Sequence, residues 1–337
     1  MNLIDLRSVI VIIVVFLISL CVNVLLVKYK HVIAILDIPN ERSSHTKITP
    51  RSGGIAMFCA FITGVLLLDI DHSLLFLLPL STVFLVGLWD DIKGLSSKIK
   101  LLLTALAAIV LFECGFEMLH LGTFGGYEII LSYVAALLFF AFAVSGFVSA
   151  INLIDGLDGL ASLVSLAILF PFAYMGYKYA DAYLFYATLI LMSSILGFFV
   201  LNWHPAKIFM GDSGSMFLGF MIATVVVYAI QKEYISAIST LFLAGLPILD
   251  TLLVMLRRTI HLQNPLRADK THIHHLLLRQ QQSVPKTVLL LGLIQVIFSY
   301  IGLGFKVRDD ILILILYILC FILCYFIVIN NDYVKKK

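Results

Sequence analysis

Residues 7–27 read RSVIVIIVVFLISLCVNVLLV, a stretch that is long and apolar enough to cross the hydrocarbon core of a bilayer as one helix. Similar stretches follow along the whole chain, and 61% of its 337 residues are hydrophobic whereas only 13% are charged. An average soluble domain carries about 25% charged residues, so this composition argues against that class. No small-residue cleavage site ends the first stretch, which indicates a membrane anchor and not a secretion signal. The sequence therefore predicts an integral membrane protein.

Eleven hydrophobic runs predict an all-α fold that forms one membrane domain over residues 1–337. They lie near residues 8–29, 53–70, 73–89, 98–113, 131–151, 159–176, 182–201, 214–230, 236–256, 287–305 and 311–329. One outer connection, 114–130, is long and glycine-rich, and we expect it to form turns. The five cysteines contain no CxxC pair, which argues against a disulfide framework or a thiolate metal site.

The distribution of lysine and arginine predicts which loops face the cytoplasm. With the N-terminus outside, 18 of the 23 basic residues fall in inner loops and 5 in outer ones. Because cytoplasmic loops carry such an excess, we expect the N-terminus outside and the C-terminus in the cytoplasm.

Five aspartates stand at the cytoplasmic ends of spans: Asp90 and Asp91 in LWDDIKG, Asp155 and Asp158 in NLIDGLDGL, and Asp212 in FMGDSGS. A carboxylate at bilayer depth costs about 2.5–3.5 kcal/mol even on lenient insertion scales, so these groups must face a polar cavity and positive charge. Adjacent helix residues point about 100° apart, which gives Asp90 and Asp91 separate roles, one as base or metal ligand and one orienting a neighbour. The pattern indicates an active site on the cytoplasmic loops.

The NLIDGLDGL motif spaces Asn152, Asp155 and Asp158 three residues apart, which places them on one polar face of a helix or tight turn. Asn152 and Asp155 are oxygen ligands suited to Mg²⁺, which favours carboxylates, waters and substrate phosphates. Asp212, bracketed by glycines, is expected to complete that site from another loop. A calcium loop would need more alternating oxygen ligands and a distal glutamate, which this motif lacks.

The segment 257–286 is basic, rich in histidine and predicted to be a cytoplasmic substrate loop. Its HIHH sequence, His272, His274 and His275, makes a cationic surface with the arginines around it, and such a surface suits phosphates. A zinc site is the alternative for these histidines, but no thiolate or adjacent carboxylate completes its ligand set. Lys100, which opens another span, also suits a phosphate oxygen.

Charge balance indicates the chemistry of the site. Five carboxylates in one pocket need compensation, which a divalent cation and the basic groups would supply. This favours a Mg²⁺-dependent phosphoryl-type transfer at the membrane face, and eleven spans favour a lipidic second substrate. Asp250, about 10 Å inside the span before the basic segment, is either a carboxylate behind the site or a helix-packing group.

Six motifs follow one another along the chain: HTKITPRSGGIAM, LWDDIKG with KLLLTA, NLIDGLDGL, IFMGDSGS, PILDT and DKTHIHHLLL. From about Asn40 to Leu278 they resemble the polyprenyl-phosphate N-acetylhexosamine-1-phosphate transferases. The HIHH form is similar to the enzymes that start O-antigen, enterobacterial common antigen or teichoic acid synthesis, whereas the phospho-MurNAc-pentapeptide transferase branch has a run of three histidines. The sequence PNERSSH also resembles transferases that use FucNAc or QuiNAc.

The resemblance implies that undecaprenyl phosphate attacks the sugar-linked phosphorus of a UDP-N-acetylhexosamine, with GlcNAc as the first expectation, and that UMP is released. It implies Mg²⁺ as cofactor, with Mn²⁺ as a substitute, and a bacterial inner membrane with the site facing the cytoplasm. No nucleic acid is expected as a partner, and a homodimer is left open.

The resemblance also implies roles for individual residues. Residues expected to act in catalysis are Asp90, the base toward the lipid phosphate, with Asp91 beside it, and Asp155. Residues expected to hold the metal are Asp212, Asn152 and Asp155, and those expected to bind the nucleotide are Asp158 and Phe209. Residues expected to contact phosphates are Lys100, His272, His274, His275, His45 and Lys47.

Two alternatives remain beside this transferase. The pentapeptide-specific relative is the alternative within the same fold. A lipid-linked sugar transporter is the alternative from another class, but it would need polar groups through to the outer side, and the chain shows no internal repeat of the kind that builds many transporters.

Overall fold

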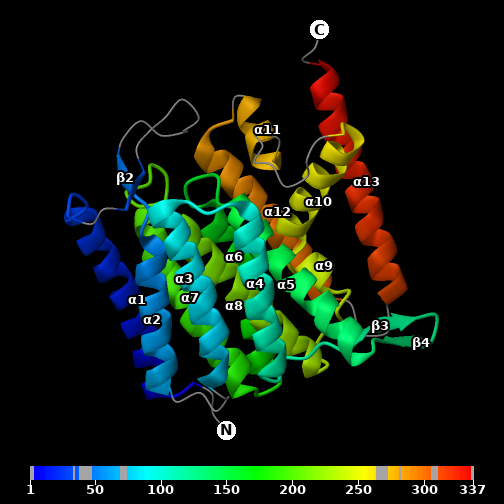
Figure 1. Cartoon of the computed structure of the whole chain (residues 1–337), viewed down its shortest axis with the longest axis horizontal. Helices are drawn as coiled ribbons and strands as arrows, with labels where there is room; N and C mark the ends of the chain where they lie inside the picture. Colours follow the sequence, from blue (N-terminus) through cyan, green and yellow to red (C-terminus); the bar gives the residue numbers. More distant parts are fainter. Residues whose placement is uncertain are drawn as a thin grey trace.

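Apolar runs in hydrocarbon form helices because a helix satisfies its backbone N–H and C=O groups within its own segment. The computed structural model of the chain describes residues 4–32, 35–37, 48–68, 74–262, 272–280, 282–304 and 310–334. The helices of these residues are α1 (Leu6–Lys28), α2 (Gly53–Leu68), η1 (Leu74–Phe76, a 3₁₀ turn), α3 (Leu77–Lys93), α4 (Ser97–Glu113), α5 (Tyr133–Ile154), α6 (Leu160–Lys178), α7 (Ala182–Asn202), α8 (Gly211–Gln231), α9 (Thr240–Leu243), α10 (Gly245–Ile260), α11 (Ile273–Arg279), α12 (Val284–Gly304) and α13 (Asp310–Val334). They form an upright bundle in which α1 begins and α13 ends at opposite ends (Figure 1).

The prediction of a mostly helical, multi-pass membrane chain is confirmed, but the count of eleven spans is not. Within the described residues, seven helices are long and apolar enough to cross a membrane: α1, α5, α6, α7, α8, α12 and α13. The predicted span 236–256 is wrong as one helix, because the chain is interrupted at Ala244 between α9 and α10.

Two small antiparallel strand pairs depart from the all-α prediction. β1 (Leu36–Asp37) pairs with β2 (Thr49–Pro50), and β3 (His120–Phe124) pairs with β4 (Tyr127–Ile130). The turn between β3 and β4 uses Gly125 and Gly126, both at positive φ, as the glycine-rich loop predicted. Strands of two to five residues show no hydrophobic period that a sequence could reveal.

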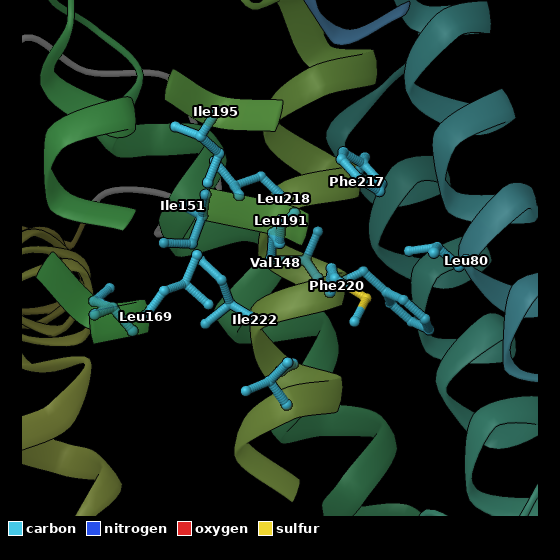
Figure 2. Packing of buried hydrophobic residues seen from close by; sticks show 14 of the residues in the cluster. Leu80, Val148, Ile151, Leu169, Leu191, Ile195, Phe217, Leu218, Phe220 and Ile222 are labelled. Carbon is cyan, nitrogen blue, oxygen red and sulfur yellow. The ribbon is translucent and has the colours of Figure 1, made fainter. Parts of the chain in front are cut away.

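Helix α8 lies in the middle of the packed core. Figure 2 shows Phe217 and Phe220 of α8 beside Leu80 of α3 and Val148 of α5. All four are buried. This helix therefore has packed neighbours on several sides at once.

Glycines let two helices reach the beginning of α8. A Cβ atom on Gly54 of α2 would collide with the backbone of Gly214, and one on Gly87 of α3 would lie 2.5 Å from the carbonyl oxygen of Asp212. Small residues of this kind allow backbones to approach closely inside a membrane. The same contacts bring the aspartates at the end of α3 to the start of α8.

Candidate active site

A polar cavity of about 270 Å³ lies among the ends of α5, α7 and α8, next to β1 and β2. Six of the predicted site residues line it: Asn152, Asp155, Asp158, Phe209, Asp212 and His275. Three further polar residues line it without having been predicted: Asp37, Arg51 and Asn202. Of the five aspartates expected to converge, Asp155, Asp158 and Asp212 line this cavity, whereas Asp90 and Asp91 do not.

Asp212, the second residue of α8, is held between two cationic side chains. Lys100 Nζ makes an ion pair with Asp212 Oδ2 and lies 2.9 Å from Asp90 Oδ2. Arg51 Nη2 lies 3.7 Å from Asp212 Oδ1. Asp90 accepts a further hydrogen bond from the backbone N–H of Leu95. Asp90 and Lys100 thus stand behind Asp212 as one charged network.

The side chain of Asp91 is completely buried and binds the start of α8. Its two carboxylate oxygens accept the backbone N–H groups of Asp212 and Ser213 at 2.8 and 2.9 Å. These N–H groups belong to the first turn of α8, where a helix lacks internal partners, so Asp91 acts as a helix cap supplied by another helix. Gly211 has φ +72°, and a Cβ there would lie 2.7 Å from Asp91 Oδ2, so glycine suits this position.

The end of α5 supplies oxygen donors to the cavity. Asn152 Nδ2 donates to Ser215 Oγ at 2.8 Å, which ties this side chain to α8. Asp155 follows the last residue of α5. Burial, followed by the nearby charges of Asp212 and Asp91, raises the pKa of the Asp155 carboxyl well above its usual range.

These donors fit a magnesium ion. Between residues 4 and 334, over the positions that the structure describes, no group of three or more His, Cys, Asp or Glu side chains is placed to hold a metal. Asp155, Asp212 and the amide of Asn152 nevertheless line one cavity. Mg²⁺ takes few protein ligands and completes its shell with waters and substrate phosphates, and a cation here would favour the ionised form of Asp155, which burial and the neighbouring carboxylates otherwise disfavour.

Asp158 and Asn202, which both line the cavity, tie the loop after α7 to the turn after α5. Asp158 Oδ2 accepts the backbone N–H of Ala206 at 3.1 Å and lies 2.7 Å from His204 Nδ1. Asn202 Oδ1 accepts the N–H of Gly159, and its Nδ2 donates to the carbonyl oxygen of Ile208. The turn after α5 and the loop after α7 are therefore joined by hydrogen bonds from both segments.

The predicted histidines separate into three different positions. His272 Nδ1 lies 2.8 Å from Asp250 Oδ2, and Asp250 Oδ1 accepts the N–H of Ile273. His274 is 2% exposed, and burial lowers the pKa of its imidazole to about 3, so this ring is neutral at physiological pH. His275 lines the cavity.

Asp250 was expected to be either a carboxylate behind the site or a helix-packing group. Its hydrogen bond to the N–H of Ile273, at the start of α11, favours the carboxylate behind the site. His45 and Lys47, both predicted to contact phosphates, lie outside the described residues.

Comparison with known proteins shows which family has this sequence. Residues 73–230 match the model of glycosyl transferase family 4. Over 305 residues, the chain is 34% identical to a probable undecaprenyl-phosphate N-acetylglucosaminyl 1-phosphate transferase of Bacillus subtilis (strain 168), covering 88% of this chain and 85% of that protein. The chain belongs to glycosyl transferase family 4, the polyprenyl-phosphate N-acetylhexosamine-1-phosphate transferases suspected from its motifs.

Two further relatives extend this result. A decaprenyl-phosphate N-acetylglucosaminephosphotransferase of Mycolicibacterium smegmatis is 30% identical over 292 residues, covering 76% of this chain and 71% of the relative. An undecaprenyl-phosphate alpha-N-acetylglucosaminyl 1-phosphate transferase of Salmonella typhi is 29% identical over 309 residues, covering 86% and 83%.

Three residues that line the cavity were not predicted from the sequence, for different reasons. Arg51 stands inside the motif HTKITPRSGGIAM, so the motif gave a signal that could have found it. Asp37 lies in a two-residue strand and Asn202 in the last turn of α7, where an isolated polar residue carries no pattern. Their position in the cavity depends on pairing between distant segments.

Replacing Gly156 with alanine is expected to lower turnover about 10- to 100-fold, because it disturbs the contact between Gly156 and His274, next to the cavity residue Asp155. A Cβ on Gly156 would collide with Nε2 of the buried His274 ring, so either α11 or the loop that carries Asp155 must move. Gly146→Ala is the matched control, since a Cβ at that position meets no atom of the described chain within 4 Å. Initial rates of UMP release measure both variants, and equal rates would show that this contact does not set the site.

Proposed function

We propose that the protein transfers GlcNAc-1-phosphate from UDP-GlcNAc to undecaprenyl phosphate and releases UMP, as a first step of envelope glycan synthesis. The observation that carries this proposal is the single cavity in which Asn152, Asp155 and Asp212 meet beside Arg51. Oxygen donors next to a guanidinium are the groups that a magnesium-bound diphosphate requires. The printed names of the relatives, which specify prenyl phosphates and N-acetylglucosaminyl phosphate transfer, support the choice of both substrates.

Asp212, Asn152 and Asp155 would hold Mg²⁺ in this reaction, and the ion would neutralise charge on the transferred phosphate. Lys100 and Arg51 each form an ion pair with the Asp212 carboxylate and hold it in place. Asp90 is the proposed base toward the lipid phosphate, and its ion pair with Lys100 favours the ionised form that a base needs. A direct in-line displacement requires no further nucleophile from the chain.

The donor is proposed to bind with its uracil end toward Asp158 and Phe209 and its diphosphate toward His275. All three residues line the cavity with the metal donors. Phe209 is fixed through its backbone, since its N–H donates to Pro50 and its carbonyl oxygen accepts from Gly53. This arrangement would leave catalysis mainly to positioning and charge stabilisation.

We further propose that the cavity faces the cytoplasm of a bacterium from its inner membrane. Eighteen of the 23 basic residues stand in the connections expected to be cytoplasmic, and residues of those connections, such as Arg51, line the cavity, which supports this orientation. The C-terminal end of α13 lies toward the same end of the bundle as α11 (Figure 1).

The test is release of UMP by the purified protein with undecaprenyl phosphate, Mg²⁺ and a panel of UDP-sugars. We expect UDP-GlcNAc to give the highest rate, EDTA to abolish it, and Mg²⁺ or Mn²⁺ to restore it, because the carboxylates cannot neutralise a diphosphate themselves. UDP-GalNAc, UDP-FucNAc, UDP-QuiNAc and UDP-MurNAc-pentapeptide are the competing donors. Absence of UMP with every donor would overturn the enzyme proposal, and a preference for the pentapeptide donor would replace its substrate.

A further inference from the structure

The helix break at Ala244 leaves backbone groups that need partners from elsewhere in the protein. Ala244 has φ −116° and ψ 36°, outside helical geometry, between the end of α9 and the start of α10. The last C=O groups of one helix and the first N–H groups of the next have no partners within their own helices. Inside a membrane, a broken helix persists only where the surrounding protein satisfies such groups.

One side chain of α12 satisfies both sides of this break. Gln295 Nε2 donates to the carbonyl oxygen of Leu243 at 2.8 Å, and Gln295 Oε1 accepts the N–H of Leu246 at 3.0 Å. The side chain is 0% exposed. Because one partner is an acceptor and the other a donor, only one orientation of the amide satisfies both.

This amide is itself anchored to the bundle. Gln295 Nε2 also donates to Ser299 Oγ at 3.0 Å, and Ser299 Oγ donates to the carbonyl oxygen of Ala167 in α6 at 3.0 Å. A Cβ on Gly245 would collide with the ring of Phe298, so α12 and the first residue of α10 are in close contact. Helix α12 therefore supports the break through polar and packing contacts together.

The break is connected to the cavity through α10. Asp250 lies four residues after Leu246, about 6 Å along a helix. It is 3% exposed and holds both the N–H of Ile273 and the ring of His272. The helix that begins there carries His275 into the cavity. A shift of α10 would thus be transmitted to the histidines by two hydrogen bonds of one carboxylate.

We propose that Gln295 is a positioning residue: by bridging Leu243 and Leu246 across the break, it fixes α10 and so holds Asp250 and α11 against the active-site cavity. The part of this proposal that is measured by activity rests on the proposed function. Its structural part concerns the order of two segments, 245–262 and 272–280, in the full-length protein.

The experiment compares Gln295→Leu with the wild type by hydrogen–deuterium exchange and by UMP-release kinetics. Leucine fills a similar volume but leaves the carbonyl of Leu243 and the N–H of Leu246 without this partner. We expect exchange to become at least about 10-fold faster over both 245–262 and 272–280. The ratio kcat/KM for UDP-GlcNAc should fall about 10- to 100-fold, with most of the change in KM, because α11 contributes to donor binding.

Asn23→Leu is the matched control. Asn23 is another completely buried amide, whose Nδ2 donates to the carbonyl oxygen of Ser19 within α1. The Asn23→Leu variant removes a comparable polar group that makes no contact with the break at Ala244. The exchange rate over 272–280 and the KM for UDP-GlcNAc should therefore match those of the wild type. A similar change in both variants would mean that general destabilisation causes it, and would overturn the positioning role.

Gln295→Glu is the conservative variant and decides the question if the leucine variant does not fold. A neutral carboxylic acid keeps one donor and one acceptor, whereas a carboxylate keeps only acceptors. At each pH, the exchange rate of segment 272–280 in Gln295→Glu is divided by the rate in the wild type. We therefore expect this ratio to be smaller at pH 6 than at pH 8. An equal ratio at both pH values, or unchanged exchange over 272–280 in Gln295→Leu, would overturn the proposal. Failure of the wild type to release UMP would instead reject the proposed function, and the exchange data would still decide the role of Gln295.

Discussion

Asp212→Asn is expected to lower turnover on the order of 10³-fold, which corresponds to about 4 kcal/mol in the activation barrier. Asparagine keeps the size of the side chain and one oxygen, but it removes the negative charge. That charge pairs with Lys100 and Arg51 and lies in the cavity with Asp155. A metal site that loses a charged ligand binds Mg²⁺ less well, and the two cations lose the group that orients them.

The measurement is the initial rate of UMP release as a function of Mg²⁺ concentration. A metal ligand at position 212 predicts both a lower maximum and a higher Mg²⁺ requirement, whereas a carboxylate that only orients Lys100 predicts a lower maximum alone. Asp181→Asn is the matched control, because Asp181 is a hydrogen-bonded carboxylate that accepts from Tyr228 and Tyr234 away from the cavity. More than a tenth of wild-type activity in Asp212→Asn would remove Asp212 from the metal site.

The sequence predicts the membrane class and the convergence of the aspartates because both follow from energies that act along the chain. Long apolar runs have to be helical in lipid, and carboxylates at their ends have to face one another and a cation. Asn152, Asp155, Asp158 and Asp212 therefore meet as predicted, and all four line the cavity. Among these four, the role of Asp212 is tested by the Asp212→Asn variant above.

What the sequence cannot predict depends on contacts between distant segments. The interruption at Ala244 stands beside Gly245 and Pro247, residues that often mark a helix boundary, but its stabilising partner, Gln295, lies 51 positions later in the chain and carries no such signal. Likewise, nothing in the pair Asp90 and Asp91 tells which one faces Lys100 and which one binds the start of α8. Three-dimensional packing, set by glycines such as Gly87, makes that choice.

Asp91→Ala is expected to destabilise the protein by about 2–4 kcal/mol and to abolish measurable turnover. The substitution leaves two backbone N–H groups at the start of α8 without their acceptor, at a position where the carboxylate is 0% exposed. One of these N–H groups belongs to Asp212 itself, so the loss of the cap displaces the proposed metal ligand. Unfolding in detergent gives the stability change, and Asp5→Ala is the control because Asp5 caps α1 through Ser8 at an exposed position, so its loss should destabilise the protein less than the loss of Asp91.

Asp91→Asn separates a capping role from a chemical one. An asparagine side chain has one acceptor oxygen and is a good helix cap, so a capping role predicts stability between those of wild type and Asp91→Ala, with residual turnover that follows stability. A role as base predicts near-normal stability with turnover as low as in the alanine variant, since an amide cannot take up the proton. Because both oxygens of Asp91 are engaged by α8 and Arg51 lies 3.5 Å from one of them, we expect the first outcome. Asp90, whose partners are Lys100 and one backbone N–H, is then the carboxylate of this pair that remains for chemistry.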